Sequence, residues 1–298
     1  MIEWWATVEP VAWAGEKLLL GYRIARNFVR PIQPAPHWRE RLNTTFGPDL
    51  VIHRALDKEP ELQIQGLLKL DDEQAELAEK WRSKLKINDP VATFTGRSSW
   101  NDDPVSVSAW ATDYASVCAL DQQGKRPTML SANALLFCAE TDEVVLHRRS
   151  DVSRDYPDCL HTFGGAYIPP GEHSRDYDHF SLVRTAQRET LEECGIGFDI
   201  SPLPKLLLGQ ELNIGFLHLA LLGVGISKGA LEAGLANHEG KISRVKAAEL
   251  TRKLRDDKWV PAGKAQVLAW LALGAPVGRH RIRFGTASGQ DVFNDFVR

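Results

Sequence analysis

The run from Arg188 to Ile196 constrains this chain most, because it places Glu189, Glu192 and Glu193 at relative positions 0, 3 and 4. Residues three and four apart share one face of an α-helix, so the run predicts a helix with three acids on one side. Like charges at this spacing repel one another, and a divalent cation offsets that repulsion well. Mg²⁺ is held by a few carboxylates, by waters and by substrate phosphate oxygens, so the run indicates a metal platform for chemistry on a phosphate chain.

The residues on either side favour this interpretation over a merely solvated acidic face, which is the commoner origin of such a pattern. Gly195 follows where a helix C-cap prefers a residue with positive φ. Upstream, residues 163–172 read Phe-Gly-Gly-Ala-Tyr-Ile-Pro-Pro-Gly-Glu. Glycines in such a turn let backbone amides and carbonyls approach a metal or a phosphate closely.

Together these residues resemble the Nudix box, which runs Gly, five spacers, Glu, seven spacers, then Arg-Glu-aliphatic-any-Glu-Glu-any-Gly-aliphatic. Thr190 stands where an aliphatic residue is usual. The other positions of the second half match, and they are Arg188, Glu189, Glu192, Glu193, Gly195 and Ile196.

The first half of the box fits less well. Gly165 to Glu172 has one spacer too many, and fifteen residues instead of seven separate Glu172 from Arg188. An insertion at about residues 173–179 explains the spacing. Asp176 or Asp178 then stands as an alternative to Glu172 for the first glutamate of the box.

The resemblance implies an α/β fold, a Nudix-type α/β/α sandwich with a mixed sheet. It also implies a metal-dependent hydrolase that cleaves a pyrophosphate linkage in a nucleoside diphosphate derivative, with Mg²⁺ or Mn²⁺. Metal ions suit this chemistry because they neutralise phosphate oxygens and lower the pKa of bound water. By position in the motif, the expected metal ligands are Glu189, Glu192, Glu193, Glu172 and the backbone carbonyl of Gly165. Arg188 is expected to pair with a box carboxylate and to fix its position.

Two kinds of residue are candidates for the general base. One is a glutamate of the box, Glu192 or Glu193, and the other is Glu239 on a late loop. Glu211 is a further carboxylate near a strand end, and for Glu211 and Glu239 a surface position is the commoner outcome. Arg149 could meet substrate phosphates through its fork of donors, and a structural ion pair fits it equally well. His147 and His161 are interpreted as structural residues.

Residues 1–125 are interpreted as a small α+β N-terminal domain of unknown role. The expected strands are 18–24, 62–68, 91–94 and 105–110, and a helix is expected from Asp71 or Asp72 through Leu85. Seven of the nine tryptophans fall in this part, where packing is a commoner role than stacking on a base. Residues 121–127 mark the boundary.

Residues 126–275 hold the box and are interpreted as the hydrolase domain. The hydrophobic pattern predicts strands at 129–138, 144–149, 205–212 and 215–226 and helices at 243–254 and 262–273. Residues 276–298 form a C-terminal tail, in which the alternating basic and apolar residues 279–284 predict an edge strand rather than an anion-binding patch.

The composition limits the classes of binding partner that the chain requires. The net charge of −3 requires neither nucleic acid nor an anionic membrane, and no apolar run reaches the roughly 18 residues of a membrane span. Four scattered cysteines argue against a zinc site or a disulfide framework and favour the cytoplasm. The expected partner is a nucleotide-like small molecule, with a homodimer suggested by the family. The alternative is a catalytically silent Nudix-fold sensor; a DNA-binding regulator and a prenyl diphosphate isomerase have less support.

Overall fold

The structure is a computed structural model that describes residues 33–153, 155–170, 178–234, 240–278 and 280–297. Several predicted features lie outside these residues: the strand at 18–24, Glu172, Asp176 and Glu239. Among the described residues, no helix is long and apolar enough to span a membrane. The four cysteines are all buried and free.

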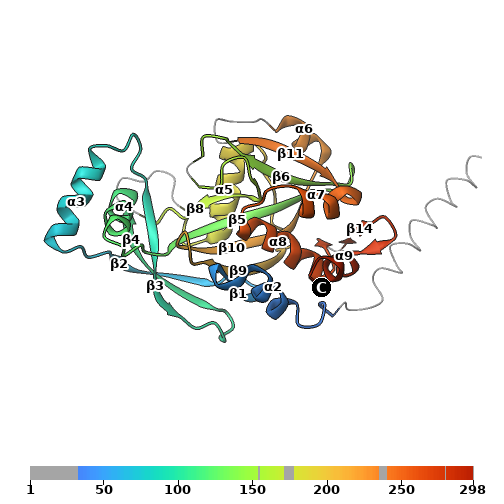
Figure 1. Cartoon of the computed structure of the whole chain (residues 1–298), viewed down its shortest axis with the longest axis horizontal. Coiled ribbons are helices and arrows are strands. Elements are labelled where there is room, and N and C mark those ends of the chain that lie inside the picture. The colour runs from blue at the N-terminus through green and yellow to red at the C-terminus, as the bar shows by residue number, and fades with distance from the viewer. Residues whose placement is uncertain (1–32, 154, 171–177, 235–239, 279, 298) are drawn as a thin grey trace, which may run out of the picture.

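One mixed sheet organises the molecule (Figure 1), and within the described residues it contains eleven strands. Its main path follows the order β1 (Leu50–Leu56), β9 (Lys205–Glu211), β10 (Phe216–Ile226), β5 (Met129–Cys138), β3 (Pro90–Ser98), β4 (Ser106–Asp113) and β2 (Glu61–Leu67). The branch off this path consists of β6 (Glu143–Arg149), β7 (Leu160–His161), β8 (Phe163–Ala166) and β11 (Gly240–Lys246). The β10–β5 and β2–β4 pairs are parallel and the other pairs are antiparallel.

Helices cover both faces of this sheet. Helix α5 (Leu182–Cys194) packs on the face that includes Ala132, Ala134 and Leu136 of β5. The intervening residues of β5 point to the opposite face, as the pleat requires, and meet α8 (Pro261–Ala272). This second face also carries α2 (Trp38–Phe46), η3 (Ala247–Glu249), α7 (Leu250–Asp256) and α9 (Gly289–Phe296). The predicted α/β fold with a mixed sheet and helices on both sides is confirmed.

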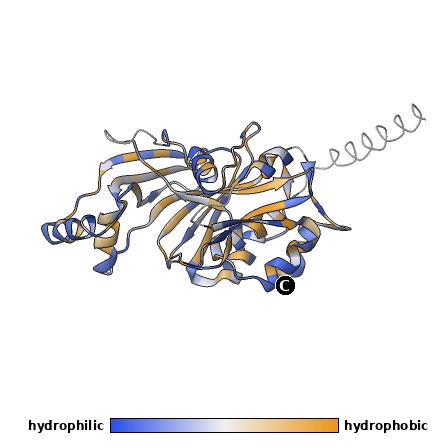
Figure 2. Ribbon diagram, turned by 90° about the horizontal axis from the view of Figure 1, so that it is seen from above, coloured by the Kyte–Doolittle hydropathy of each residue, from blue (hydrophilic) through white to orange (hydrophobic). Residues whose placement is uncertain are grey.

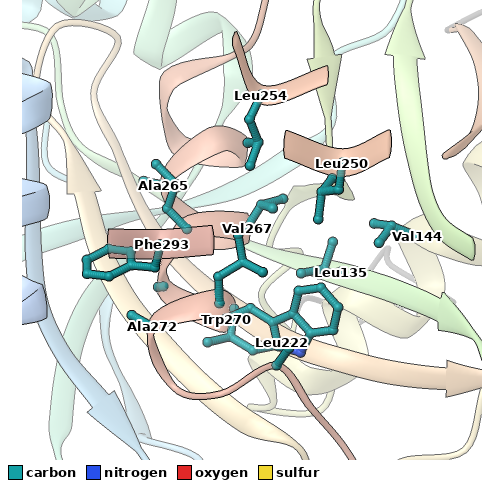
Figure 3. Close-up of a cluster of buried hydrophobic side chains, with 14 of the residues drawn as sticks. Leu135, Val144, Leu222, Leu250, Leu254, Ala265, Val267, Trp270, Ala272 and Phe293 are labelled. Carbon is teal, nitrogen blue, oxygen red and sulfur yellow. The ribbon is translucent and has the colours of Figure 1, made fainter. Parts of the chain in front are cut away.

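Trp270 of α8 is fully buried in the hydrophobic core on this second face (Figure 3), and its ring lies 6.0 Å from the rings of Phe137 in β5 and Phe284. Its indole N–H donates to the carbonyl of Pro276 at 2.8 Å, so burial leaves no polar atom of the ring unpaired. Gly223 of β10 lies against this contact, and a Cβ there would be 2.1 Å from the same carbonyl. A glycine is therefore required where β10 passes beneath Trp270.

The described part of residues 1–125 shares the sheet with the rest of the chain. Strand β1 pairs with β9, and β3 pairs with β5 through Thr93 and Met129. Helix α3 (Asp72–Arg82) and helix α4 (Tyr114–Gln122) pack on each other at one end of the molecule (Figure 1). Figure 2 shows α3, at the far left, as mostly hydrophilic, while apolar residues concentrate in the sheet. The domain boundary at 125 stays a prediction.

Several segments follow the sequence closely. The predicted strands 62–68, 91–94, 105–110, 129–138, 144–149, 205–212 and 215–226 correspond to β2, β3, β4, β5, β6, β9 and β10, and the helix 262–273 to α8. Helix α3 begins after Asp71, whose side chain accepts from the backbone N–H of Gln74 while the Gln74 side chain accepts from the N–H of Asp71. This reciprocal cap explains why the start of α3 could be predicted from the sequence.

The helix predicted at 243–254 is wrong in its first half. Residues 240–246 form β11, which pairs with β6 through its whole length, and the chain turns helical only at η3 and α7. The long-range pairing with β6 overrides the local helical pattern. Helix α4, at the edge of the expected linker, was also missed. The tail forms short paired strands, β12 (Pro276–Val277) with β13 (His280–Arg281) and β14 (Arg283–Phe284) with β15 (Ala287–Ser288), before α9.

Asp113 joins α3 to α4. One of its oxygens caps α4 by accepting from the N–H of Ser116 at 2.9 Å, and the other accepts from Arg82 at 2.6 Å and from Asn88 at 2.9 Å. Burial alone would raise the pKa of Asp113, but these hydrogen bonds outweigh it, and the pKa lies well below the ordinary 3.8. The charged form is therefore the one that the fold stabilises.

We predict that Asp113→Asn lowers the free energy of unfolding by about 1–3 kcal/mol at neutral pH, since it removes charged hydrogen bonds. Because the folded pKa is depressed, this contribution is present above the unfolded pKa and is lost as pH falls through the folded pKa. Urea unfolding of both proteins should show the difference shrinking below about pH 4. Asp57→Asn, at an exposed ion pair, is the control. A difference that stays constant down to pH 3 would contradict this account.

Candidate active site

Helix α5 carries the acidic run and ends at Gly195, whose φ of 70° gives the predicted C-cap. Its N-terminus is capped by Ser181, which accepts from the N–H of Arg184 at 3.1 Å. The helix lies against β8, whose Gly164 and Gly165 pair with Asn133 and Ala132 of β5. The acidic run and the glycine segment (Gly164 and Gly165), read separately in the sequence, therefore meet in space.

Glu193 is held by the glycine segment and is almost fully buried. One carboxylate oxygen accepts from the N–H of Gly164 at 2.8 Å, and the other lies 3.2 Å from Nδ1 of His147. The His147 ring is itself stacked on Phe163, with ring centroids 5.6 Å apart. These contacts fix the carboxylate of Glu193 beside the backbone of β8.

Glu189 lies directly on Gly165. A Cβ on Gly165 would be only 2.4 Å from the carboxyl carbon of Glu189, so a glycine is needed at this position. Burial raises the pKa of Glu189 to about 8, with Arg188 opposing the rise and the charges of Glu193 and Glu192 adding to it. Two carboxylates of α5, the buried Glu193 and the partly buried Glu189, thus flank the same short backbone segment.

Arg188 uses all five of its N–H groups inside the protein. Nε and Nη2 form a fork on Asp178 at 2.9 and 3.1 Å, and Nη2 also reaches the carbonyl of Ala166 at 2.9 Å. Nη1 donates to Glu189 at 2.8 Å and to Glu192 at 2.9 Å. A guanidinium has five donors, so Arg188 keeps none for a substrate phosphate and acts by positioning the box carboxylates.

Asp178, an alternative for the first box glutamate, has a different environment from a metal ligand. It is 2% exposed, and its oxygens accept from Arg188, from the N–H of Ile168 at 3.0 Å and from the hydroxyl of Thr185 at 2.9 Å. These bonds tie the segment after β8 to the first turns of α5. The chain therefore uses Asp178 as the acidic partner of Arg188.

The remaining predicted ligands are placed less favourably. The side chain of Glu192 is 58% exposed and accepts from Arg188. Glu172, and the candidate base Glu239, lie outside the described residues. Within the part of the chain that the structure describes, no group of three or more His, Cys, Asp or Glu residues could hold a metal ion. The described site thus offers one buried carboxylate, one partly buried carboxylate and a backbone segment.

A cavity of about 200 Å³ lies on the same glycine segment, which forms part of its wall. Arg149 lines this cavity, and its Nε donates to the carbonyl of Asp155 at 3.1 Å. His161 also lines it, and burial lowers the pKa of His161 well below the ordinary value. His161 is therefore neutral at pH 7. Among the described residues that line this cavity, Arg149 is the one with a permanent positive charge.

The cavity contains polar residues that the sequence analysis missed or misplaced. Glu211 was expected at the surface, and it is fully buried at the end of β9. Strand β1, which was not predicted, pairs with β9 and places it in the interior of the sheet. The missed members are Ser131, Asn133, Tyr156 and His218. A signal was present for three of them, since Ser131, Asn133 and His218 are polar residues within otherwise apolar strand sequences.

We predict that Asp178→Asn lowers the free energy of unfolding by about 3–5 kcal/mol, because it breaks a buried ion pair and leaves Arg188 partly uncompensated. Denaturant unfolding followed by circular dichroism measures the loss. Glu192→Gln, at the exposed partner of the same arginine, should cost less than about 1 kcal/mol. Equal losses in the two variants would show that Asp178 does not hold the helix in place.

Comparison with known proteins finds likeness at the level of solved structures. No protein-family model and no curated protein matches the chain. A MutT protein from Methanosarcina mazei Go1 is 21% identical, with 46% of this chain and 86% of that chain covered and a TM-score of 0.31. A NUDIX hydrolase from Nitrosomonas europaea is 16% identical, with 53% and 98% covered and a TM-score of 0.33.

A third structure is a bifunctional NMN adenylyltransferase/ADP ribose pyrophosphatase from Francisella tularensis, solved with AMP and a manganese ion. It is 12% identical with a TM-score of 0.39, and the match covers 52% of this chain and 45% of that one. Likeness this low does not carry a function across, so the residues of this chain must supply it. In the sequence of its box and among its structural neighbours, the chain resembles the Nudix hydrolases.

Proposed function

We propose that this chain is a metal-dependent hydrolase that cleaves a pyrophosphate linkage in a nucleoside diphosphate derivative. The observation that carries the proposal is the meeting of Glu189 and Glu193 with Gly164 and Gly165, beside a cavity lined by the same glycines. A buried and a partly buried carboxylate beside a glycine backbone are groups that suit a hard cation and a phosphate chain.

The donor set fits a divalent cation. Glu189 is partly buried next to Glu193 and has a raised pKa, so a nearby cation would keep it ionised at neutral pH. Glu189, Glu193 and the carbonyl of Gly165 would hold the ion, with Glu192 and Glu172 as the further predicted ligands. Mg²⁺ or Mn²⁺ bound there would neutralise phosphate oxygens and lower the pKa of a bound water.

Arg188 and His147 contact the carboxylates of α5, whereas Arg149 lies in the wall of the cavity. Arg188 fixes two carboxylates of α5 while its opposite edge is bound to Asp178. His147 lies beside Glu193 and limits its rotation. Arg149 in the cavity wall is the side chain that we assign to the substrate phosphates, because its planar fork of donors matches their oxygens. Glu192, Glu193 and Glu239 remain the proposed sources of the general base.

We predict that Glu189→Gln and Glu193→Gln each lower kcat by about 100-fold or more, the usual cost of losing a group that stabilises transition-state charge. Glu192→Gln should cost less, because the Glu192 side chain is largely exposed. The assay measures product release from a panel of nucleoside diphosphate derivatives with Mg²⁺ and with Mn²⁺. Glu232→Gln, on the exposed surface of α6 (Lys228–Ala233), is the control. Turnover within about threefold of wild type in all variants would contradict the proposed site.

A second test uses no catalysis. Gly165→Ala would push its Cβ into the carboxylate of Glu189, whereas Gly197→Ala meets nothing within 4 Å. We predict that Gly165→Ala weakens Mn²⁺ binding by at least about tenfold, because one ligand is displaced, while Gly197→Ala binds as wild type does. Titration followed by electron paramagnetic resonance measures free Mn²⁺ directly. Equal Mn²⁺ affinities in the two variants would show that the ion does not bind at this segment.

The sensor hypothesis is the second candidate, and it is favoured by the finding that Glu193 and Glu192 already accept hydrogen bonds from the protein itself, from the N–H of Gly164 and from Arg188. Binding of a panel member without cleavage by either metal would support it. A cytoplasmic location and a homodimer stay predictions.

A further inference from the structure

The cavity beside the glycine segment is lined by both aromatic and polar side chains. Tyr114, Tyr156 and Phe216 contribute aromatic rings, and Glu211 and His218 contribute polar atoms. Its volume of about 200 Å³ is smaller than a typical pocket for a whole drug-sized ligand, which begins near 300 Å³. The space therefore suits one ring system, with the remainder of a substrate outside it.

Glu211 presents one free acceptor to this space. Its Oε1 accepts from the hydroxyl of Tyr156 at 2.8 Å, and that hydroxyl in turn accepts from the side-chain amide of Asn213 at 3.1 Å. Burial, together with the charge of Glu211, raises the pKa of Tyr156, so the hydroxyl keeps its proton and donates. Oε2 of Glu211 is buried and has no hydrogen-bond partner among the described residues.

His218 presents one free donor. Its Nδ1 lies 2.6 Å from Oγ of Ser131 and 3.2 Å from Nδ2 of Asn133. An amide NH₂ can only donate, so Nδ1 accepts and the neutral ring carries its proton on Nε2. Nε2 is buried and, within the described part of the chain, makes no hydrogen bond. It lies 3.5 Å from Oε2 of Glu211.

A buried donor and a buried acceptor without partners are costly, and native structures keep few of them. Here the two lie side by side and both belong to residues that line one cavity. Their spacing matches a ligand edge with an acceptor and an N–H donor next to each other, which nucleobases present. The aromatic rings suit the flat faces of the same ligand, because every base has a π-face.

We propose that this cavity binds the nucleobase of the substrate, with Oε2 of Glu211 accepting from an N–H of the base and Nε2–H of His218 donating to the adjacent acceptor. The inference rests on the proposed function for the nucleotide nature of the substrate, and it names Glu211 as a specificity-determining residue. Because Gly164 and Gly165 form part of the wall, a base bound in the cavity would be separated from Glu189 by this one backbone segment.

The test measures binding of free nucleosides, which have no pyrophosphate and need no metal. Guanosine, adenosine, uridine and cytidine are titrated calorimetrically into the full chain, together with analogues that are methylated on the edge N–H. The same titrations are made with Glu211→Gln, in which Tyr156 holds the amide oxygen and the NH₂ faces the base. Glu61→Gln, exposed on β2, is the matched control, and thermal melting verifies that each variant is folded.

We expect at least one nucleoside to bind the wild type. Methylation of its edge N–H and the Glu211→Gln substitution should each weaken binding by about 10- to 100-fold, while Glu61→Gln changes nothing. The methylated analogue keeps the test decisive even if Glu211→Gln fails to fold. Equal binding of methylated and unmethylated nucleosides, or no binding up to millimolar concentration, would overturn the inference.

The two proposals fail in different ways. Cleavage of a pyrophosphate substrate without any nucleoside binding would overturn the nucleobase assignment and leave the hydrolase standing. Nucleoside binding that depends on Glu211, without cleavage under either metal, would retain the assignment and overturn the hydrolase.

Discussion

The guanidinium of Arg188 is the interaction on which the site depends. It links three parts of the chain: the carboxylate of Asp178 before α5, the backbone of Ala166 in β8, and the acids Glu189 and Glu192 within the helix. An acidic helix face repels itself and, when buried, protonates. Arg188 supplies the positive charge that opposes both tendencies at Glu189. It also sets the distance between α5 and the glycine segment, because its donors bind on both sides.

The two adjacent glycines serve opposite faces of β8. A Cβ on Gly165 would strike Glu189 on the helix side, and a Cβ on Gly164 would strike Ala132 and Asn133 of β5. Successive residues of a strand point to opposite sides, so the pair opens room for a carboxylate on one face and for close strand packing on the other. The glycine segment is thereby thin enough to be shared by the acidic helix and the cavity. This arrangement explains why both residue 164 and residue 165 are glycine.

Features that depend on residues close together in the sequence could be predicted, and features that depend on distant residues could not. Helix α5, with its acids and its end at Gly195, and the apolar β5 are specified by neighbours in the sequence, and both were identified. Strand β11 was misread because its partner, β6, lies about a hundred residues away. Glu211 was misplaced because β9 lies in the interior of the sheet, between β10 and β1, and no local pattern identified β1. Asp178 was found as an acid near the box, but its role as the partner of Arg188 depends on the path of an insertion that spacing alone does not define.

Glu189 and Glu193 on one side of the glycine segment have different partners from Glu211 on the other side. This difference suits the two sets of carboxylates to different kinds of ligand. Glu189 and Glu193 belong to one acidic face, with a guanidinium beside Glu189 and a backbone N–H on Glu193. Such a concentration of charge suits a divalent ion and phosphate. Glu211 is bound by a tyrosine hydroxyl and faces an imidazole whose other nitrogen is held by Ser131 and Asn133. These groups have fixed donor and acceptor directions, which select a ligand by its hydrogen-bonding edge rather than by its charge. Under the proposed function, the acidic face of α5 would act on the phosphates that nucleotides share, and the cavity would recognise the base in which they differ.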